Sequence, residues 1–540
     1  MSGARARLRS TLAALLAAAA AGCAVGPDYA RPPVVTPEAY KENAGWKVAE
    51  PRDDALRGTW WELFGDPQLD ALEAQVSIGN QSLIAAEATY REARALVRQA
   101  RAAYFPTVTA GVGYTRSQQS ETLGSSSPAN THNQNTQAFS TFQLPIDVAW
   151  TPDFWGRVRR SVEANRASAQ ASAGDLETAR LSFQSELAQD YFQLRMLDAQ
   201  KRLLDDTVAA YTTALQLTRN RYRSGVASRV DVVQAETQLK TTQAQAIEVG
   251  VARAQTEHAI ALLVGQPPST FSLPPAPLES TPPAIPVGVP SALLERRPDI
   301  AAAERRMAAA NAQIGVAIAA YFPTITLSFS GGLESGSVSQ WFTWPSRFWS
   351  VGPSITETVF DGGLRGAQTD QARAAYDASV AAYRQTVLAA FQGVEDNLAA
   401  LRILEEESRV QTEAVQSARE SVRLTTSQYR AGTVSYLNVI TVQAIALGNE
   451  ITAVQIQAGF LRIDPRRDGG NSLSGLMPNL AENSLTHVAA ALHQMECGLL
   501  KRSHPEPRAG SLGHLPGHLD VVQCAVDERQ IQQCPALWDG

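Results

Sequence analysis

The chain has 540 residues, a formal net charge of −6 and a hydrophobic content of 44%. The mild charge argues against nucleic-acid binding and against a polyanionic tail. After the N-terminal region no run of eighteen apolar residues occurs, so the composition does not predict a membrane-spanning helix. The length suggests either several domains or one very elongated domain.

The N-terminus is typical of a secretory signal that ends at a lipid-attachment cysteine. Basic residues precede a short apolar stretch that ends Ala20-Ala21-Gly22-Cys23, similar to the bacterial lipobox. This pattern predicts a signal peptide over residues 1–22, lipid attachment at Cys23 and an extended leader over 23–58. The alternative is an ordinary signal peptide with a chance cysteine. By the sorting rule for such lipoproteins, Ala24 favours the outer membrane over the inner one.

Residues 59–266 form the first of two similar units. Asp66-Pro67 predicts the start of a helix that runs to about Ala103, with a break at Gly79. Tyr104-Phe105-Pro106-Thr107 then opens a strand, because the apolar period changes from 3.6 to 2. After a polar loop, a second strand places five apolar residues on one face: Phe142, Leu144, Ile146, Val148 and Trp150.

The longest feature is a proline-free stretch from Gly156 to Gly265. From Phe183 onward its apolar residues recur at alternating steps of three and four, close to a heptad seam. Gly225 predicts the end of the first helix, and a second helical pattern resumes at Val230. At about 1.5 Å per residue the first arm would be about 100 Å long. The stretch therefore predicts a long helical hairpin that is part of a rod or a tube.

After a proline-rich linker over 267–290, residues 291–458 repeat this plan. Tyr321-Phe322-Pro323-Thr324 restates the earlier Tyr-Phe-Pro-Thr motif and opens a third strand. A long helix follows the fourth strand, and it ends at Gly432 in the role of Gly225. Because both units keep the order of every element, the chain contains an internal repeat.

The four predicted strands alternate apolar with small polar residues, as a wall between lipid and water does. The fourth strand is predicted over 348–360, and Trp341, Trp344 and Trp349 fit an interfacial aromatic girdle. Open sheet edges cannot lie in hydrocarbon, and four strands are too few to close a barrel. The chain must therefore form an oligomer if these strands span a membrane. The alternative is a soluble four-stranded sheet packed on helices.

Together these features resemble the outer-membrane factors of Gram-negative bacteria, the TolC-like family that includes NodT-type efflux lipoproteins. The resemblance covers roughly residues 10–458. It rests on the lipobox, Trp60-Trp61 through Pro67, both Tyr-Phe-Pro-Thr motifs, the block from Leu294 to Thr324 and two Tyr-Arg-x-Gly turns. It implies a mainly α fold with membrane β structure. Long helical hairpins would form a trimeric periplasmic α-barrel, and four strands per chain would build a transmembrane β-barrel.

The resemblance also implies a function and a set of partners. It implies a lipid-anchored homotrimer in the outer membrane that conducts small molecules outward. The expected partners are outer-membrane lipid, a periplasmic adaptor protein and an inner-membrane pump of the resistance–nodulation–division class. No cofactor, metal, nucleic acid or catalysis is expected. The alternatives are the exit duct of a type I secretion system and a non-conducting, structural coiled-coil lipoprotein; a periplasmic hydrolase lacks any catalytic motif.

In the family the hairpin tips meet the adaptor. The resemblance therefore assigns adaptor contacts to Tyr222, Arg223, Gly225, Val226, Tyr429, Arg430, Gly432 and Thr433. The alternative is a pair of capped turns with solvated arginines.

The resemblance places the periplasmic aperture beside these tips. It assigns Arg229 and Asp231 to this aperture in the first repeat and Asn438 and Thr441 in the second, where relatives commonly carry aspartate. Three copies of Asp231 would give a cation-attracting ring. Alternatively, Asp231 is a favourable charge at a helix N-terminus.

From about Gly459 the repeat pattern breaks. Phe460 to Gly470 stops the helix, whereas the return arm of the first hairpin continues to Leu263. Residues 459–540 therefore form an atypical tail, for which we hypothesise a frameshift; a diverged extension is the alternative. Its His514 and His518 are separated by proline and glycine, so no helix face presents them to a metal. Translation of the other two reading frames tests the frameshift.

Overall fold

The computed structural model describes residues 25–33, 37, 41, 59–118, 138–278 and 297–461. All of them lie in one compact unit. Several predictions fall outside the described residues. These are the signal peptide, lipid attachment at Cys23, most of the leader and of the linker, and the tail from residue 462 with its histidines.

The first repeat opens with three short helical elements, η1 (Trp60–Phe64), α2 (Pro67–Gly79) and α3 (Gln81–Ala102). The Asp66 carboxylate caps α2 by accepting the backbone N–H groups of Gln68 and Leu69, as the sequence predicted. The predicted break at Gly79 is confirmed. A Cβ atom there would lie 2.3 Å from the carbonyl oxygen of Val264, so glycine lets α2 approach the end of α5 (Arg229–Leu263).

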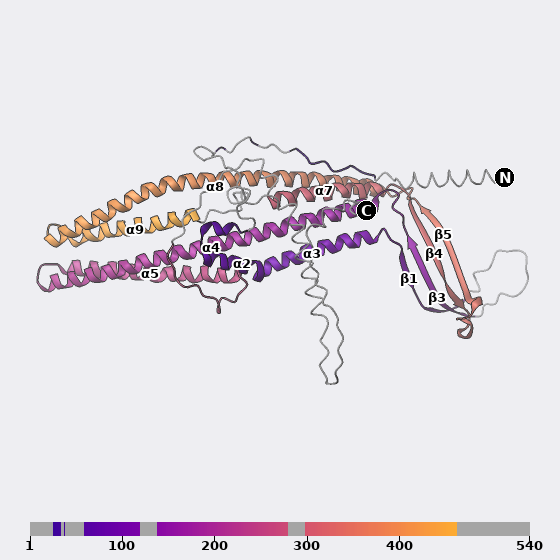
Figure 1. Cartoon of the computed structure of the whole chain (residues 1–540), viewed down its shortest axis with the longest axis horizontal. Coiled ribbons are helices and arrows are strands. Elements are labelled where there is room, and N and C mark those ends of the chain that lie inside the picture. Colours follow the sequence, from indigo (N-terminus) through magenta and orange to yellow (C-terminus); the bar gives the residue numbers. More distant parts are fainter. Residues whose placement is uncertain are drawn as a thin grey trace, which may run out of the picture. The chain divides into compact units, whose positions relative to one another are not determined.

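Two long helical hairpins follow the predicted plan (Figure 1). α4 (Arg157–Arg223) returns as α5, and α8 (Leu364–Ala431) returns as α9 (Tyr436–Leu461). α7 (Pro298–Ala319) precedes the second hairpin and packs between α4 and α8. α4 has 67 residues, which corresponds to about 100 Å of helix.

α9 is described over 26 residues, whereas α5 has 35. Its length and apolar composition alone would allow it to cross a membrane. It nevertheless packs against α8 in the way that α5 packs against α4, and it also contacts both helices of the first hairpin. The internal repeat therefore accounts for this apolar helix as a return arm.

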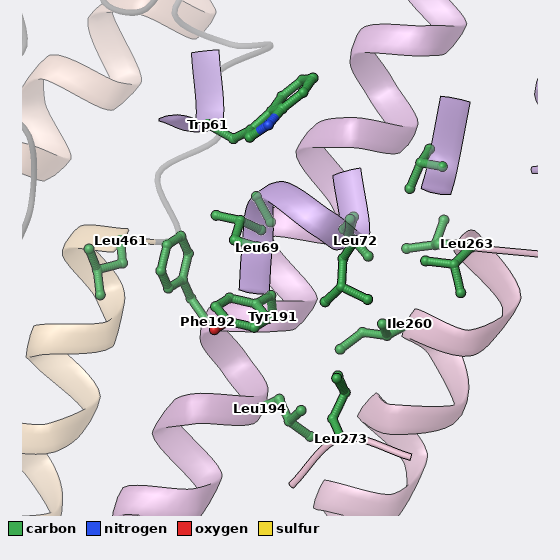
Figure 2. Close-up of a cluster of buried hydrophobic side chains, with 14 of the residues drawn as sticks. Trp61, Leu69, Leu72, Tyr191, Phe192, Leu194, Ile260, Leu263, Leu273 and Leu461 are labelled. Atoms are coloured by element: carbon green, nitrogen blue, oxygen red, sulfur yellow. The ribbon is translucent and has the colours of Figure 1, made fainter. Parts of the chain in front are cut away.

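The core is a series of seams along the helices. The seam in Figure 2 joins α2, α4, α5 and the end of α9, with Leu69, Tyr191, Ile260 and Leu461 among its buried members. The predicted stripe of α4 forms part of these seams. Most of its residues are buried, with Val208 partly buried, but Tyr222 at the helix end is exposed.

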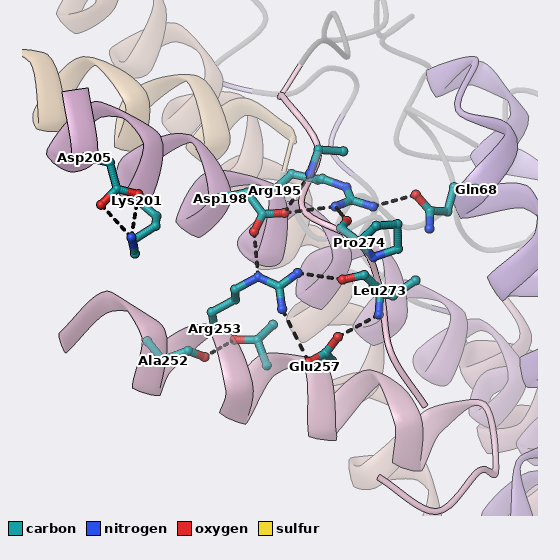
Figure 3. Close-up of polar contacts among 12 residues, drawn as sticks. Gln68, Arg195, Asp198, Lys201, Asp205, Ala252, Arg253, Glu257, Leu273 and Pro274 are labelled. Carbon is teal, nitrogen blue, oxygen red and sulfur yellow. Dashed lines mark hydrogen bonds and ion pairs between the residues drawn. The ribbon is translucent and has the colours of Figure 1, made fainter. Parts of the chain in front are cut away.

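A buried polar network joins the two helices of the first hairpin toward the end of α5 (Figure 3). The Asp198 carboxylate accepts hydrogen bonds from Arg195 at 3.0 Å and from Arg253 at 2.7 Å. Arg253 also donates to the carbonyl oxygen of Leu273, and the Glu257 carboxylate accepts the Leu273 N–H. The network thus ties α4, α5 and the chain that leaves α5 into one unit.

One antiparallel sheet contains strands from both repeats. Its members are β1 (Thr107–Ala110), β2 (Gly113–Ser117), β3 (Phe139–Trp150), β4 (Thr324–Ser335) and β5 (Arg347–Thr356). β1 and β2 pair with β3 in a single register, so they form one strand interrupted at residues 111–112. The order is this interrupted strand, β3, β4 and β5. The four predicted strands are therefore confirmed in number and in order along the chain.

The fourth strand ends at Thr356, so its predicted extent to residue 360 was wrong. Thr356 pairs with Thr324, the first residue of β4, so residues 357–360 have no partner in β4. Arg365 in the first turn of α8 holds this segment instead. Its guanidinium binds the carbonyl oxygen of Thr358 and the carboxylates of Glu357 and Asp361. These contacts draw the chain after Thr356 into the start of the helix.

Candidate functional site

The two hairpin turns share two backbone hydrogen bonds, from each glycine and from the residue that follows it. Gly225 and Gly432 adopt φ values of +79° and +80°, a region that favours glycine. The Val226 N–H donates to the carbonyl oxygen of Arg221, and the Thr433 N–H donates to that of Gln428. No atom lies within 4 Å of a Cβ built on either glycine, so the backbone conformation and not space requires them. The predicted helix ends are confirmed.

Asp231 belongs to a capping box at the start of α5. Its backbone N–H donates to the Ser228 hydroxyl, and its carboxylate accepts the Ser228 N–H at 3.0 Å. The structure therefore gives Asp231 the helix N-terminal role that the sequence offered as the alternative. The carboxylate remains only partly buried near the turn.

The other predicted aperture residues lie on exposed parts of the two return arms. Arg229 is exposed at the first residue of α5 and forms no ion pair among the described residues. Asn438 and Thr441 are exposed in the first turns of α9, where the Thr441 hydroxyl donates to the carbonyl oxygen of Leu437. Among the described residues, no hydrogen bond or ion pair joins Arg229 or Asp231 to Asn438 or Thr441.

The two tips differ in which tyrosine they expose. Tyr222 is 44% exposed, whereas its repeat partner Tyr429 is only 6% exposed. Tyr429 packs against Tyr436 with ring centroids 5.2 Å apart. Burial, together with the smaller effect of Tyr429, raises the pKa of Tyr436 to about 12. Of the predicted adaptor contacts, Tyr429 is thus covered within its own chain, while Arg223, Val226, Arg430 and Thr433 are exposed.

Arg221 joins the two tips, and the sequence analysis did not single it out. Its guanidinium lies 4.7 Å from the centre of the Tyr429 ring and donates to the carbonyl oxygen of Arg430. Below it, a shared apolar cluster contains Tyr211 and Leu239 of the first hairpin and Tyr436 and Val439 of the second. A comparison of the two repeats could have marked this residue, because the second repeat has the neutral Gln428 where the first has Arg221.

The sheet has one apolar and one polar face. The register places Val148 beside Val108 and Phe329, and Phe329 beside Val351. The apolar face further includes Tyr114, Phe142, Leu144, Ile146, Trp150, Leu327, Leu333, Trp349 and Ile355. The opposite face includes Thr109, Thr115, Thr141, Gln143, Asp147, Thr326, Ser328, Ser330, Glu334, Ser350 and Ser354.

Much of this apolar face is exposed in the single chain. Ile146, Phe329, Trp349 and Val351 are all exposed, although large apolar patches on soluble chains are usually covered. β3 has 12 residues, enough for the about 9–11 that a tilted transmembrane strand needs. Within the described chain, β5 at one edge and the interrupted strand at the other each pair on one side only.

Aromatic residues mark both ends of this face. At one end Phe142 contacts Tyr114 and Trp341, with ring centroids 4.8 Å and 5.6 Å away. Trp341 and Trp344, both predicted girdle residues, lie in the connection between β4 and β5, and Trp349 lies near the start of β5. At the other end Trp155 stacks on Phe322 of the second Tyr-Phe-Pro-Thr motif. Aromatic belts at both water interfaces are typical of transmembrane barrels.

A sheet with one apolar and one polar face, joined to long helical hairpins, is typical of one class of protein, the outer-membrane channels with a helical periplasmic part. Comparison with known proteins agrees with this class. The family described as outer membrane efflux protein matches residues 73–266 and 289–461. The chain belongs to this family, whose members are channels rather than enzymes.

Its relatives include proteins of several export systems. The pyoverdine export outer membrane protein OpmQ of Pseudomonas aeruginosa is 30% identical over 407 residues, covering 75% of this chain and 84% of OpmQ. The toluene efflux pump outer membrane protein TtgF of Pseudomonas putida is 31% identical, covering 80% and 90%. Nodulation protein T of Rhizobium leguminosarum bv. trifolii is also 31% identical, covering 78% and 88%.

Solved structures show the same architecture. The outer-membrane channel OprN superposes with a TM-score of 0.76 at 31% identity, over 84% of this chain and all of OprN. The outer membrane protein VceC of Vibrio cholerae superposes with a TM-score of 0.69 at 26% identity, over 77% of this chain and 98% of VceC. The predicted fold class is confirmed: helical hairpins with a membrane β-sheet in an outer-membrane channel.

Proposed function

We propose that three copies of this chain form an outer-membrane exit duct for small molecules. The observation that carries the proposal is the two-faced sheet with two unpaired edges. Three such sheets joined edge to edge would close a barrel, with lipid outside and a polar lumen inside. The role is conduction, without catalysis. No group of three metal-ligating side chains occurs among the described residues.

The duct works with an inner-membrane pump of the resistance–nodulation–division class and a periplasmic adaptor. Relatives named as parts of efflux pumps support this assignment. The exposed tip residues Tyr222, Arg223, Val226, Arg430 and Thr433 are available to the adaptor. Because OpmQ and TtgF are named for different cargoes, we assign the choice of cargo to the pump and adaptor.

The aperture of this trimer would lie next to the tips. Arg229 and Asp231 of α5 and Asn438 and Thr441 of α9 are our candidates for its lining. Three copies of Asp231 would attract cations even though the carboxylate also caps α5. The second repeat would add only neutral polar groups at its matching positions.

A lipid anchor on Cys23 completes the proposal. It is supported by the lipobox pattern and by relatives named as outer membrane proteins. An acyl chain contributes about 0.8 kcal/mol per buried methylene to membrane binding.

Conductance in planar lipid bilayers tests the duct. Purified protein should run as a trimer in detergent and should give discrete current steps after insertion. The matched control is the same preparation denatured by heat before addition. Trimers that insert but never conduct would contradict the duct and would favour a structural coiled-coil lipoprotein.

A further inference from the structure

Residues 25–31 lie against elements of both repeats, although they precede the first repeat in the chain. The Val25 N–H donates to the carbonyl oxygen of Trp155 at 3.2 Å. The carbonyl oxygen of Gly26 accepts from Arg160 of α4, and that of Pro27 accepts from the Asn311 amide of α7. Three consecutive residues are thus held by three different parts of the chain.

Arg160 is the centre of this seat. Its side chain is only 5% exposed, and it donates to the carbonyl oxygens of Val25 and Gly26 and to the Asp28 carboxylate. Within its own helix it pairs with Glu163. A buried guanidinium is costly unless its donors are satisfied, so most of the groups that satisfy Arg160 come from the leader.

Two glycines allow the leader to approach this closely. Gly26 has a φ of +99°, and a Cβ there would lie 2.5 Å from the Cα of Gly315 in α7. A Cβ on Gly315 would in turn lie 2.8 Å from the Cγ of Arg160. At position 26 the clash would be with backbone, which a side-chain rotation cannot relieve. The contact is therefore specific to glycine at position 26 for two reasons, its φ and its neighbour.

The leader continues onto α8. Tyr29 packs against a buried cluster that includes Ile300 and Met307 of α7 and Tyr383 of α8. Arg31 donates to the Tyr383 hydroxyl at 3.0 Å and pairs with Glu304 of α7. The seat therefore spans α4 of the first repeat and α7 and α8 of the second.

The seat begins at one aromatic end of the sheet. Trp155, which accepts the Val25 N–H, donates its indole N–H to the carbonyl oxygen of Pro323, just before β4. Cys23 precedes Val25 by two residues in the sequence, and two residues of chain span at most about 7 Å. A docked leader therefore restricts where an acyl group on Cys23 can enter the membrane to this end of the sheet.

We infer that residues 25–31 are a docking peptide whose seat, centred on Arg160 and Gly315, couples the lipid anchor to the packing of the two repeats. The anchor is then part of the folded structure, positioned at the aromatic end marked by Trp155 and Phe322, and not a free tether. The inference rests on the proposed lipid-anchored channel and adds the residues that position its anchor.

The test uses the full-length acylated protein, purified as a trimer. Gly26→Ala and Arg160→Ala each damage the seat and leave the lipobox intact. Arg157→Ala, an exposed arginine one turn earlier in α4, is the matched control for Arg160. Gly250→Ala in α5, where nothing lies within 4 Å of an added Cβ, is the control for Gly26. Hydrogen exchange of residues 25–31 reports docking, and the yield of heat-resistant trimer reports coupling.

We expect both seat variants to raise the exchange rate of residues 25–31 by roughly tenfold or more, because φ > 0 and a backbone clash exclude alanine at position 26. The yield of heat-resistant trimer should fall together with the protection of residues 25–31 from hydrogen exchange, while both control variants behave like wild type. Unchanged protection in the seat variants would overturn the inference, and so would lost protection with an unchanged trimer yield. Wild-type trimers that never conduct would instead contradict the proposed channel.

Discussion

Glu73 in α2 is a fully buried carboxyl group without a hydrogen-bond partner for either oxygen in the described structure. Burial, together with the smaller effect of the Asp70 carboxylate one turn earlier, raises its pKa to about 9. The side chain is therefore protonated at neutral pH in the folded chain. Because ionisation of the buried Glu73 carboxyl group is unfavourable, the stability of the helical core depends on pH.

The Glu73→Gln variant tests this state. Because the folded pKa lies above the unfolded one, the folded chain keeps a proton that the unfolded chain releases. Wild-type stability is then complete below about pH 4.5 and decreases as the pH rises toward 9, by at most about 1.4 kcal/mol per pH unit. We expect the melting temperature of Glu73→Gln minus that of wild type to increase between pH 5 and pH 9.

Differential scanning calorimetry in detergent at several pH values measures this difference. Glu92→Gln is the control, because Glu92 is exposed on the neighbouring α3. A difference that stays constant with pH for Glu73→Gln would show that the carboxyl group is already ionised in the fold.

At the scale of elements, the alternation of apolar and polar residues along each strand gives the sheet two chemically different faces. Ile146 in the middle of β3 lies on the apolar face and is exposed in one chain. Ser330 of β4 pairs with Asp147, the next residue along, on the polar face. The two positions are close together but belong to opposite sides of the proposed membrane wall.

Arginine substitutions at these two positions should therefore have different effects. Ile146→Arg would place a charge in hydrocarbon, at a cost of about 2–4 kcal/mol near the bilayer midplane. We expect little Ile146→Arg trimer in the outer-membrane fraction. Ser330→Arg should assemble normally and shift the ion selectivity of the channel toward anions. Trimer gels of membrane fractions and reversal potentials measure the two effects; equal assembly of both variants would argue against a lipid-facing apolar side.

At the scale of the whole molecule, the two hairpins of one chain are joined at their tips. Arg221 of the first hairpin contacts the ring of Tyr429 and the backbone of Arg430 in the second, above the shared apolar cluster. A cation–π contact of this kind contributes about 0.5–2 kcal/mol. The joint opposes separation of the hairpins at the end where the aperture is proposed.

Arg221→Ala should weaken this joint and favour the open aperture. In planar bilayers we expect more frequent or larger current steps than in wild type. Arg223→Ala, an exposed neighbour, is the control in the absence of adaptor. Unchanged conductance in Arg221→Ala would show that the joint does not limit the opening.

The sequence by itself determined the features that depend on short stretches of chain. The break at Gly79, the helix ends at Gly225 and Gly432 and the alternation of β3 follow from local backbone preferences and periodicity. The repeat of these local signals was enough to predict the order of elements, and the motifs that resemble those of the outer-membrane factors predicted the class of channel. The end of β5 was missed, because it depends on where the partner strand β4 begins, at Thr324.

Only the tertiary structure decided which side chains meet across long separations. It buried Tyr429 and exposed Tyr222 although both stand in a Tyr-Arg-x-Gly turn, because only Tyr429 receives Arg221 from the other hairpin. It also brought Asp28 of the leader to Arg160, which is 132 residues further along the chain. Such contacts depend on how the helices pack against one another, and no periodicity within one helix encodes them.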